Sequence, residues 1–247
     1  MLGRGHSAGQ IVQAVTAARE AGFDNLSLDL IYALPGQTVK GWRHTLERAL
    51  ALEPEHLSAY GLDIAEGTPL FERHRRGEIE AIGENAHLAM RELTRELCQQ
   101  AGLERYEISN YARPGFECRH NTTYWRNQCY LGLGAGAWSY LDGVRMANLP
   151  GPEAYIAAMR DGGDACDYRE RLDPHDALAE TVMMGLRMAE GLSLEVLEEL
   201  HGAERIRALV AKAEPLAQMG LVDLSAAHLR LALEGEALHS EVCVRLT

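Results

Sequence analysis

The sequence has no apolar run long enough to cross a lipid bilayer. A membrane helix needs about 20 consecutive apolar residues, and no stretch among the 247 residues approaches that length. Residues 1–7 also lack the apolar segment of a secretion signal. These two absences predict a protein that works in the cytoplasm.

Closely spaced cysteines are also missing. The chain has five cysteines, and no two of them are separated by only two or three residues, as a local zinc or iron–sulfur motif requires. A disulfide framework is uncommon in a chain of this size. The sequence therefore predicts isolated, reduced thiols at Cys98, Cys118, Cys129, Cys166 and Cys243.

Positive charge is scarce relative to negative charge. Lys and Arg total 24, whereas Asp and Glu total 36, which gives a formal net charge of −12. A surface this acidic repels phosphate backbones and anionic lipid headgroups. Nucleic-acid binding is therefore not expected as the main task.

Two patterns of apolar residues, one helical and one strand-like, alternate along the first half of the chain. Segments with helical spacing alternate with short apolar runs that end at Pro or Gly. This alternation is typical of parallel β/α units, so the sequence predicts an α/β fold. The predicted order is a helix over 7–22, a strand over 25–34, a helix over 38–52, a strand over 56–62, a helix over 86–102 and a strand over 104–109.

The pattern changes near residues 165–172. Asp173 and Pro174 form a typical helix start, because Asp caps the first turn and Pro fits its first position. Two further helices, a small hairpin and a terminal helix are predicted downstream. This order describes a small winged-helix-like domain. The predicted domains are therefore 1–168 and 169–247.

Several blocks of sequence occur in the order found in one protein family. They are residues 28–38 (LDLIYALPGQT), 54–60 (PEHLSAY), 106–112 (YEISNYA), 119–125 (RHNTTYW) and 132–137 (GLGAGA). Together they resemble the HemN/HemW family of radical S-adenosylmethionine proteins. The resemblance implies the C-terminal strands of a radical-SAM (β/α) barrel, followed by the winged-helix-like domain. The block at 119–125 favours a HemW-type protein over a true coproporphyrinogen oxidase.

The chain also departs from the family pattern. The family's three-cysteine motif for a [4Fe–4S] cluster and its glycine-rich strand end for S-adenosylmethionine are both absent. Residues 2–6 resemble a segment that normally lies well inside the barrel, so we expect an internal start or a fragment. Ala33 stands where the family usually has Gly, and Trp138 stands where many members have His.

The resemblance implies that His120, Asn121, Tyr124 and Trp125 contact heme. A neutral imidazole is a common axial ligand of heme iron, so His120 is the candidate metal ligand. Tyr124 and Trp125 offer flat faces for a porphyrin, and the nearby arginines 113, 119 and 126 can pair with propionates. The alternative is that His120 and Asn121 fasten a loop by hydrogen bonds while Trp125 fills the core. Since His120 and Tyr124 share a face in a helix or a strand, Trp125 is interpreted as the packing residue.

By the same resemblance, Arg4, Asp29, Asp63 and Trp138 contact S-adenosylmethionine. An arginine can hold the methionyl carboxylate, and an aspartate can accept hydrogen bonds from ammonium or hydroxyl groups. Asp29 is flanked by apolar residues on a strand expected to be buried, where a charge needs a reason. The alternative for each residue is a plain ion pair or a helix cap.

Three functions are compatible with these residues. A heme chaperone on a radical-SAM scaffold is favoured. The alternative is an oxygen-independent coproporphyrinogen oxidase-like enzyme, although without cluster cysteines this chain is not expected to catalyse alone. A winged-helix regulator is disfavoured, because the helix predicted over 205–219 carries few basic residues.

Heme and a heme-acceptor protein are the expected partners. A homodimer, or pairing with a separate N-terminal half, is also expected, because a partial barrel leaves the strand over 25–34 with an unpaired edge. Peripheral membrane contact stays open.

Overall fold

The computed structural model describes all residues except 1–4, 6 and 161. The chain divides into two compact units, Met1–Glu117 (the first unit) and Cys118–Thr247 (the second unit). The predicted domain boundary at 168/169 lies inside the second unit and stays a prediction. No helix among the described residues is long and apolar enough to cross a membrane.

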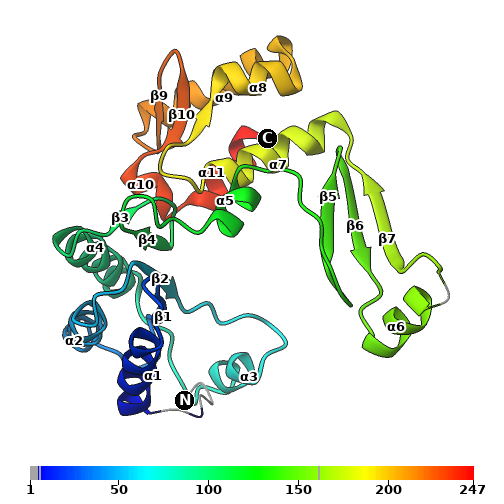
Figure 1. The fold of residues 1–247 in the computed structure, drawn as a ribbon. Helices are drawn as coiled ribbons and strands as arrows, with labels where there is room; N and C mark the ends of the chain where they lie inside the picture. The colour runs from blue at the N-terminus through cyan, green and yellow to red at the C-terminus, as the bar shows by residue number, and fades with distance from the viewer. Residues whose placement is uncertain (1–4, 6, 161) are drawn as a thin grey trace. The chain divides into compact units, whose positions relative to one another are not determined.

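The first unit begins with two β/α repeats, as the sequence predicts (Figure 1). Its strands β1 (Ser27–Tyr32) and β2 (His56–Gly61) are parallel, with the register running from Ser27↔His56 to Tyr32↔Gly61. Parallel strands need a crossover, and α2 (Val39–Leu50) supplies it. The remaining helices of the unit are α1 (Ala8–Glu20), α3 (Pro69–Arg75) and α4 (Glu84–Gln100).

The prediction of one strand over 104–109 is wrong. The structure has two short strands, β3 (Glu104–Arg105) and β4 (Asn110–Ala112), in a sheet of order β1-β2-β4-β3. Strand β4 runs antiparallel to β2. The chain turns between them because the buried Glu107 carboxylate accepts a hydrogen bond from the Ser109 amide at 2.7 Å. Such local side-chain bonds compete with a continuous strand.

The core of the first unit lies on one face of this sheet. Trp42 of α2 is fully buried, and its indole N–H donates to the Met90 carbonyl at 3.2 Å and to Thr94 Oγ1 at 2.9 Å on α4. This pairing satisfies the polar end of a large apolar side chain, as burial requires. Leu46, Leu57 and several residues of α4 complete the core.

Strand β1 is an edge strand. Among the described residues it pairs with β2 alone, which agrees with the predicted open edge. Helix α1 is capped by Ser7, which forms a capping box with Gln10, yet none of the helix residues is buried. Its apolar residues Ile11 and Val12 stay 40% and 39% exposed. The first unit therefore presents both an open strand edge and an uncovered helix face.

The second unit starts with helix α5 (Arg119–Trp125) and an antiparallel sheet of β5 (Trp138–Leu141), β6 (Val144–Asn148) and β7 (Cys166–Arg171). Helix α6 (Pro152–Arg160) lies between β6 and β7 in sequence. Gly132 runs so close to β5 that a Cβ there would meet the Trp138 carbonyl oxygen at 2.0 Å. Only glycine permits that approach.

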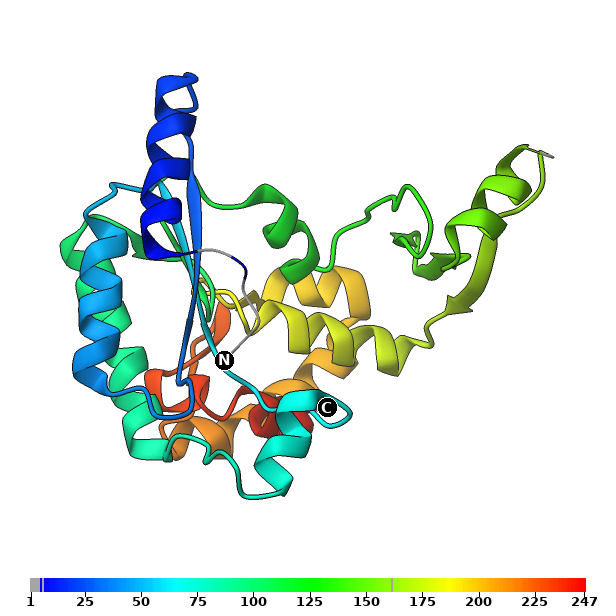
Figure 2. The same ribbon diagram turned by 90° about the horizontal axis from the view of Figure 1, so that it is seen from below.

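The predicted winged-helix-like domain is confirmed as a fold. Three helices precede a β-hairpin, and one further short strand, β8, completes a three-stranded sheet of order β8-β10-β9. These elements run from yellow to red in Figure 2. They are α7 (Pro174–Gly185), β8 (Leu192–Ser193), α8 (Leu194–His201), α9 (Ala203–Gln218), β9 (Val222–Leu224), β10 (His228–Leu231), α10 (Leu233–Glu236) and α11 (His239–Leu246).

Candidate functional site

Helix α5 is fastened to the winged-helix part of the second unit by one side. The Arg187 guanidinium lies 4.3 Å from the centre of the Trp125 ring. Just after the helix, the Asn127 side chain donates to Thr181 on α7 at 3.0 Å. A seven-residue helix with no side-chain N-cap is not stable alone, so these contacts fix its orientation.

His120 and Tyr124 occupy a different side of α5. They are four residues apart, and their rings meet edge to face with centroids 4.7 Å apart. The helical form of the segment thus places the two predicted heme-contact residues together. His120 is exposed, and its ring forms no hydrogen bond with any residue that the structure describes. An imidazole in this setting has its nitrogen lone pair available to a metal.

Tyr124 packs against Tyr130, which in turn pairs with Tyr140. The Tyr124 ring packs edge to face on Tyr130 at 4.5 Å, and Tyr130 exchanges backbone hydrogen bonds with Tyr140 at 2.8 and 2.9 Å. Burial raises the pKa of both Tyr130 and Tyr140, and the nearby Arg145 guanidinium opposes that rise. The phenols therefore stay protonated at neutral pH and serve as neutral aromatic surfaces.

Arg145 links this sheet to helix α7. Its guanidinium lies 5.9 Å from the Tyr140 ring centre and forms a two-pronged pair with Glu180, both bonds 2.5 Å long. The carboxylate raises the pKa of Arg145 further. A bidentate ion pair of this kind fixes the orientation of the Arg145 side chain. The pair therefore also limits the movement of the strands that carry Tyr140 and pair with Tyr130.

Trp125 lies against the winged-helix part of the second unit, and its predicted heme contact stays a prediction. Its side chain is half-buried against Arg187, and its Nε1 is buried without a hydrogen-bond partner. Asn121 is also half-buried on α5. Of the arginines considered for propionates, Arg126 instead pairs with Glu190 at 3.0 Å, whereas Arg113 and Arg119 are exposed.

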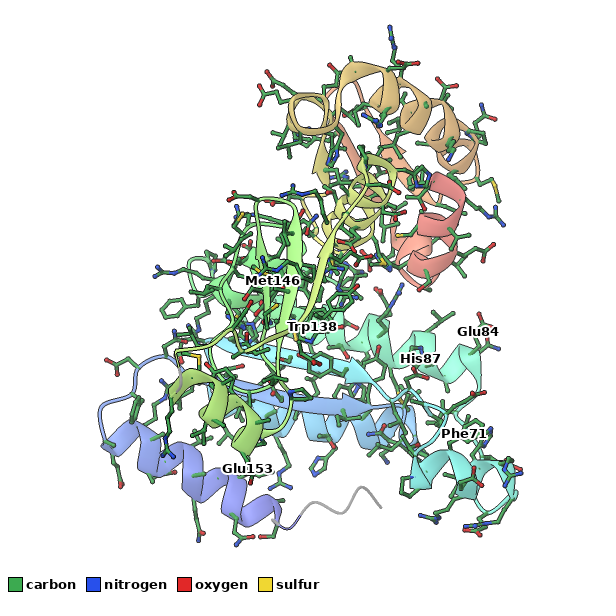
Figure 3. The ribbon with its side chains drawn as sticks, turned by 90° about the vertical axis from the view of Figure 1, so that its right-hand side faces the viewer. Phe71, Glu84, His87, Trp138, Met146 and Glu153 are labelled. Carbon is green, nitrogen blue, oxygen red and sulfur yellow. The ribbon has the colours of Figure 1, made fainter. Side chains whose placement is uncertain are left out.

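Trp138 lies on β5 of the second unit, beside β6, which carries Met146 (Figure 3). Its side chain is 48% exposed, and its ring centre lies 5.5 Å from that of Tyr168 on β7. The sheet register places both rings across from Ala147 on the same face. Its predicted contact with S-adenosylmethionine stays a prediction.

Asp29 and Asp63 belong to the first unit. Asp29 lies at the middle of β1, and Asp63 follows the carboxyl end of β2. Both are exposed. The expectation that Asp29 sits on a buried strand is therefore wrong, because β1 is an edge strand. Arg4 lies outside the residues that the structure describes.

Sequence reasoning missed a histidine at the carboxyl ends of β1 and β2. His87 of α4 (Figure 3) packs on Tyr32, the last residue of β1, with ring centres 5.1 Å apart. A Cβ at Gly61, the last residue of β2, would meet His87 Nε2 at 2.5 Å. Burial lowers the pKa of His87, as does the neighbouring Arg91. Its position in the helical repeat of α4 is the one sequence signal that could have found it.

The described residues contain no group of three or more His, Cys, Asp or Glu side chains that could hold a metal ion. All five cysteines are free. Cys98 and Cys243 are buried, and burial raises the pKa of their thiols to about 12 and about 11. The two are thus poor thiolate ligands.

A family model matches part of the second unit. Residues 172–238 match the HemN C-terminal domain. This segment contains the winged-helix-like elements from α7 to α10.

Curated relatives extend the similarity along most of the chain. The chain is 32% identical over 241 residues to "Heme chaperone HemW" of Bacillus subtilis, with 98% of this chain and 64% of that protein covered. It is 37% identical over 211 residues to "Heme chaperone HemW" of Synechocystis, with coverages of 85% and 51%. A zebrafish relative, "Radical S-adenosyl methionine domain-containing protein 1, mitochondrial", is 33% identical over 202 residues, with 78% and 45% covered. The chain thus spans less than two thirds of the length of these relatives.

A solved structure has the same fold. It is described as "Coproporphyrinogen III oxidase (HemN) from Escherichia coli is a Radical SAM enzyme" and aligns with a TM-score of 0.76 at 23% identity. The alignment covers 98% of this chain and 59% of the other. Taken together, these similarities relate the chain along most of its length to proteins named heme chaperones, and its residues 172–238 to the HemN C-terminal domain family.

Proposed function

We propose that this chain carries the heme-contacting part of a heme chaperone, with His120 as an axial ligand of the iron. The observation that carries the proposal is the exposed His120 imidazole next to Tyr124 on α5. Relatives named heme chaperones match along most of the chain. A neutral imidazole is a standard axial ligand of heme iron.

The surroundings of His120 suit a ligand that must be released again. Helix α5 is held from the side of Trp125, so the His120 side does not depend on heme for its fold. Tyr124 places an aromatic edge beside the imidazole, and Tyr130 supports it. An exposed ligand leaves the opposite face of the porphyrin accessible to an acceptor protein. We propose such an acceptor as partner and the cytoplasm as the place of action.

S-adenosylmethionine is the second ligand in the proposal. The exposed carboxylates of Asp29 and Asp63 suit its ammonium and hydroxyl groups, and Arg4 is the other contact proposed in the first unit. When bound to a [4Fe–4S] cluster, this cofactor supplies radical chemistry. The five cysteines of this chain have no cluster spacing, so no cluster ligand is assigned to them.

The alternative function is that of a coproporphyrinogen oxidase-like enzyme. The structural match to HemN and its C-terminal domain favours it. An oxidase of this type acts on porphyrinogens, which hold no iron and need no axial ligand. Binding of iron heme through His120 therefore separates the two functions.

A heme titration tests the proposal. Ferric heme added to the chain should give a shifted Soret band that saturates, and His120→Ala should weaken binding by about tenfold or more, because the iron loses its ligand. His44→Ala, an exposed histidine of α2, is the matched control. An unchanged Soret shift in His120→Ala would remove His120 as the ligand.

A further inference from the structure

The sheet of β5, β6 and β7 has one face on which the side chains form ordered rows. Side chains alternate along a strand, and residues paired across neighbouring strands share a face. The register therefore places two rows of three residues on the same face. They are Trp138, Ala147 and Tyr168, and next to them Tyr140, Arg145 and Glu170. We call the first set the aromatic row and the second set the charged row.

The charged row has its polar groups engaged. The Arg145 guanidinium binds the Glu180 carboxylate of α7 through two hydrogen bonds and lies 5.9 Å from the centre of the Tyr140 ring. The Glu170 carboxylate accepts a hydrogen bond from the Tyr168 hydroxyl at 2.7 Å. A ligand would have to break these contacts in order to bind the charged row. The aromatic row is therefore the more favourable place for a ligand on this face.

The aromatic row presents flat rings to solvent. Trp138 and Tyr168 are 48% and 41% exposed, and their ring centres lie 5.5 Å apart with the ring planes inclined by 55°. Ala147 lies between them in the register and is only 8% exposed, because its small side chain lets both rings lean over it. Neighbouring exposed apolar side chains often mark a binding surface. The outward faces of these two rings are such a surface.

The neighbouring backbone leaves Trp138 uncovered. Gly132 runs beside the Trp138 backbone, and its amide donates a hydrogen bond to Ser139 Oγ at 2.9 Å. Ser139 alternates with Trp138 and pairs with Met146, so it belongs to the opposite face of the sheet. Because position 132 is glycine, it has no side chain that could cover the Trp138 ring.

The aromatic row lies close to the helix that carries His120. Tyr130 pairs with Tyr140 of the charged row. The Tyr124 ring of α5 packs on Tyr130, and the His120 ring packs on Tyr124. Neighbouring tyrosines thus link the sheet face to the proposed iron ligand within the second unit.

We infer that Trp138 and Tyr168 bind the flat tetrapyrrole ring of a porphyrin by stacking, in a contact that does not involve the iron. The inference rests on the proposed function, because it concerns the same cargo. A tetrapyrrole presents a wide conjugated face, and aromatic side chains pack on such faces in offset or edge-to-face geometry. The Tyr168 hydroxyl can keep its hydrogen bond to Glu170 while its ring contacts the ligand.

The adenine of S-adenosylmethionine is the other flat ring that could contact Trp138. Recognition of a base combines stacking with hydrogen bonds to its edge. In the aromatic row, Ala147 has no polar side chain, and the Tyr168 hydroxyl already donates to Glu170. The row therefore suits a large ring that is held by its faces better than a small ring that is recognised at its edge.

Titration with metal-free protoporphyrin, followed by the fluorescence of the porphyrin, tests this inference. With no iron present, His120 cannot act as a metal ligand, so the signal reports contacts with the ring alone. Trp138→Ala should weaken binding by about tenfold, because a stacking partner is lost. Trp138→Phe keeps a flat ring and should stay within about threefold of wild type. His120→Ala should bind metal-free protoporphyrin like wild type.

Two further variants keep the test decisive. Tyr168→Leu keeps an apolar side chain but loses the flat ring, and it should weaken binding even if Trp138→Ala does not fold. Phe23→Ala removes a 61% exposed ring from the first unit and should bind like wild type.

Wild-type affinity in both Trp138→Ala and Tyr168→Leu, or no binding of metal-free protoporphyrin by the wild-type chain, would overturn the inference. Displacement of the bound porphyrin by S-adenosylmethionine would also overturn it, because the surface would then belong to adenine. None of these results alters the comparison of His120→Ala with wild type in the heme titration, which tests the iron ligand.

Discussion

The two units differ in how far their own residues cover their apolar faces. In the winged-helix part, the stripe of α9 is almost sealed, with Ile206 at 1%, Leu209 at 3% and Leu216 at 3% exposure. Helix α1 of the first unit has a comparable apolar stripe, yet it has no buried residue. The same kind of pattern thus leads to two different packing outcomes.

This difference shows what an amphipathic pattern can predict. Helical spacing predicts a helix and the face that would be buried. It does not predict whether a neighbour covers that face. Strand β1 makes the same point, because its apolar sequence is typical of a central strand, while one of its edges is unpaired within the described part of the chain. Stability should therefore respond to the α9 stripe far more than to the α1 stripe.

The largest effect should come from matched isoleucines in the two helices. Ile206→Ala removes a fully buried side chain and should lower the free energy of unfolding by about 2–5 kcal/mol. Ile11→Ala makes the same chemical change at a 40% exposed site and should cost less than about 0.5 kcal/mol. Urea denaturation of both variants measures the two values. Equal costs would show that α1 is packed as tightly as α9.

The next effect separates the two sides of α5. Trp125→Leu loses the contact with Arg187 and should destabilise the second unit by about 1–3 kcal/mol. His120→Ala removes an exposed ring and should leave stability within about 0.5 kcal/mol. Thermal unfolding monitored by far-UV circular dichroism, which does not rely on tryptophan fluorescence, measures both changes in stability. A reversed order would exchange the structural and binding roles of the two residues.

A smaller effect is expected at Ala33, which follows β1. Its backbone φ is 59°, in the left-handed region that disfavours residues with a Cβ. Ala33→Gly relieves this strain and should therefore raise the free energy of unfolding by about 1 kcal/mol. The greater conformational entropy of glycine in the unfolded chain offsets part of that gain. Ala51→Gly, after α2 with φ −64°, is the matched control and should destabilise. Destabilisation by Ala33→Gly would mean that strain at this turn is absent.

The smallest expected effect is on the pH dependence of the free energy of unfolding. Burial holds the pKa of His56 below its ordinary value of 6.5, against the opposing pull of Asp29 and Glu107. The imidazole of His56 therefore binds a proton more tightly in the unfolded chain than in the folded chain. The stability that depends on neutral His56 is present above pH 6.5 and is lost as the pH falls below that value. His56→Gln should flatten the fall in stability between pH 7.5 and 5.5. The exposed His44→Gln should leave that fall unchanged.

Much of the fold could be predicted from the sequence, because local signals and packing agree. The helical spacing over 7–22, the apolar runs of β1 and β2 and the Asp173–Pro174 helix start all mark elements that the structure contains. The region from 104 to 171 could not be predicted as well. Its turn depends on the buried Glu107, and its strands are short and held by cross-strand tyrosines.

Two local features of the candidate site could be predicted from the sequence, but the residues that surround them could not. Periodicity alone placed His120 and Tyr124 on one side of α5 and favoured packing for Trp125. It could not reveal the support from Tyr130 and Tyr140, which depends on distant strands. The buried side-chain oxygen of Asn110, which lacks a hydrogen-bond partner among the described residues, was also hidden, because a local hydrogen bond from the Asn110 amide to Glu107 sets its orientation.

Hydrogen–deuterium exchange with and without ferric heme tests the central claim most directly. Bound heme should slow amide exchange in α5 and the adjoining residues through Tyr130, in the second unit. It should cause no change in β1, β2 or α1 of the first unit. Protection confined to the first unit, with α5 unaffected, would contradict the claim that His120 on α5 holds the heme.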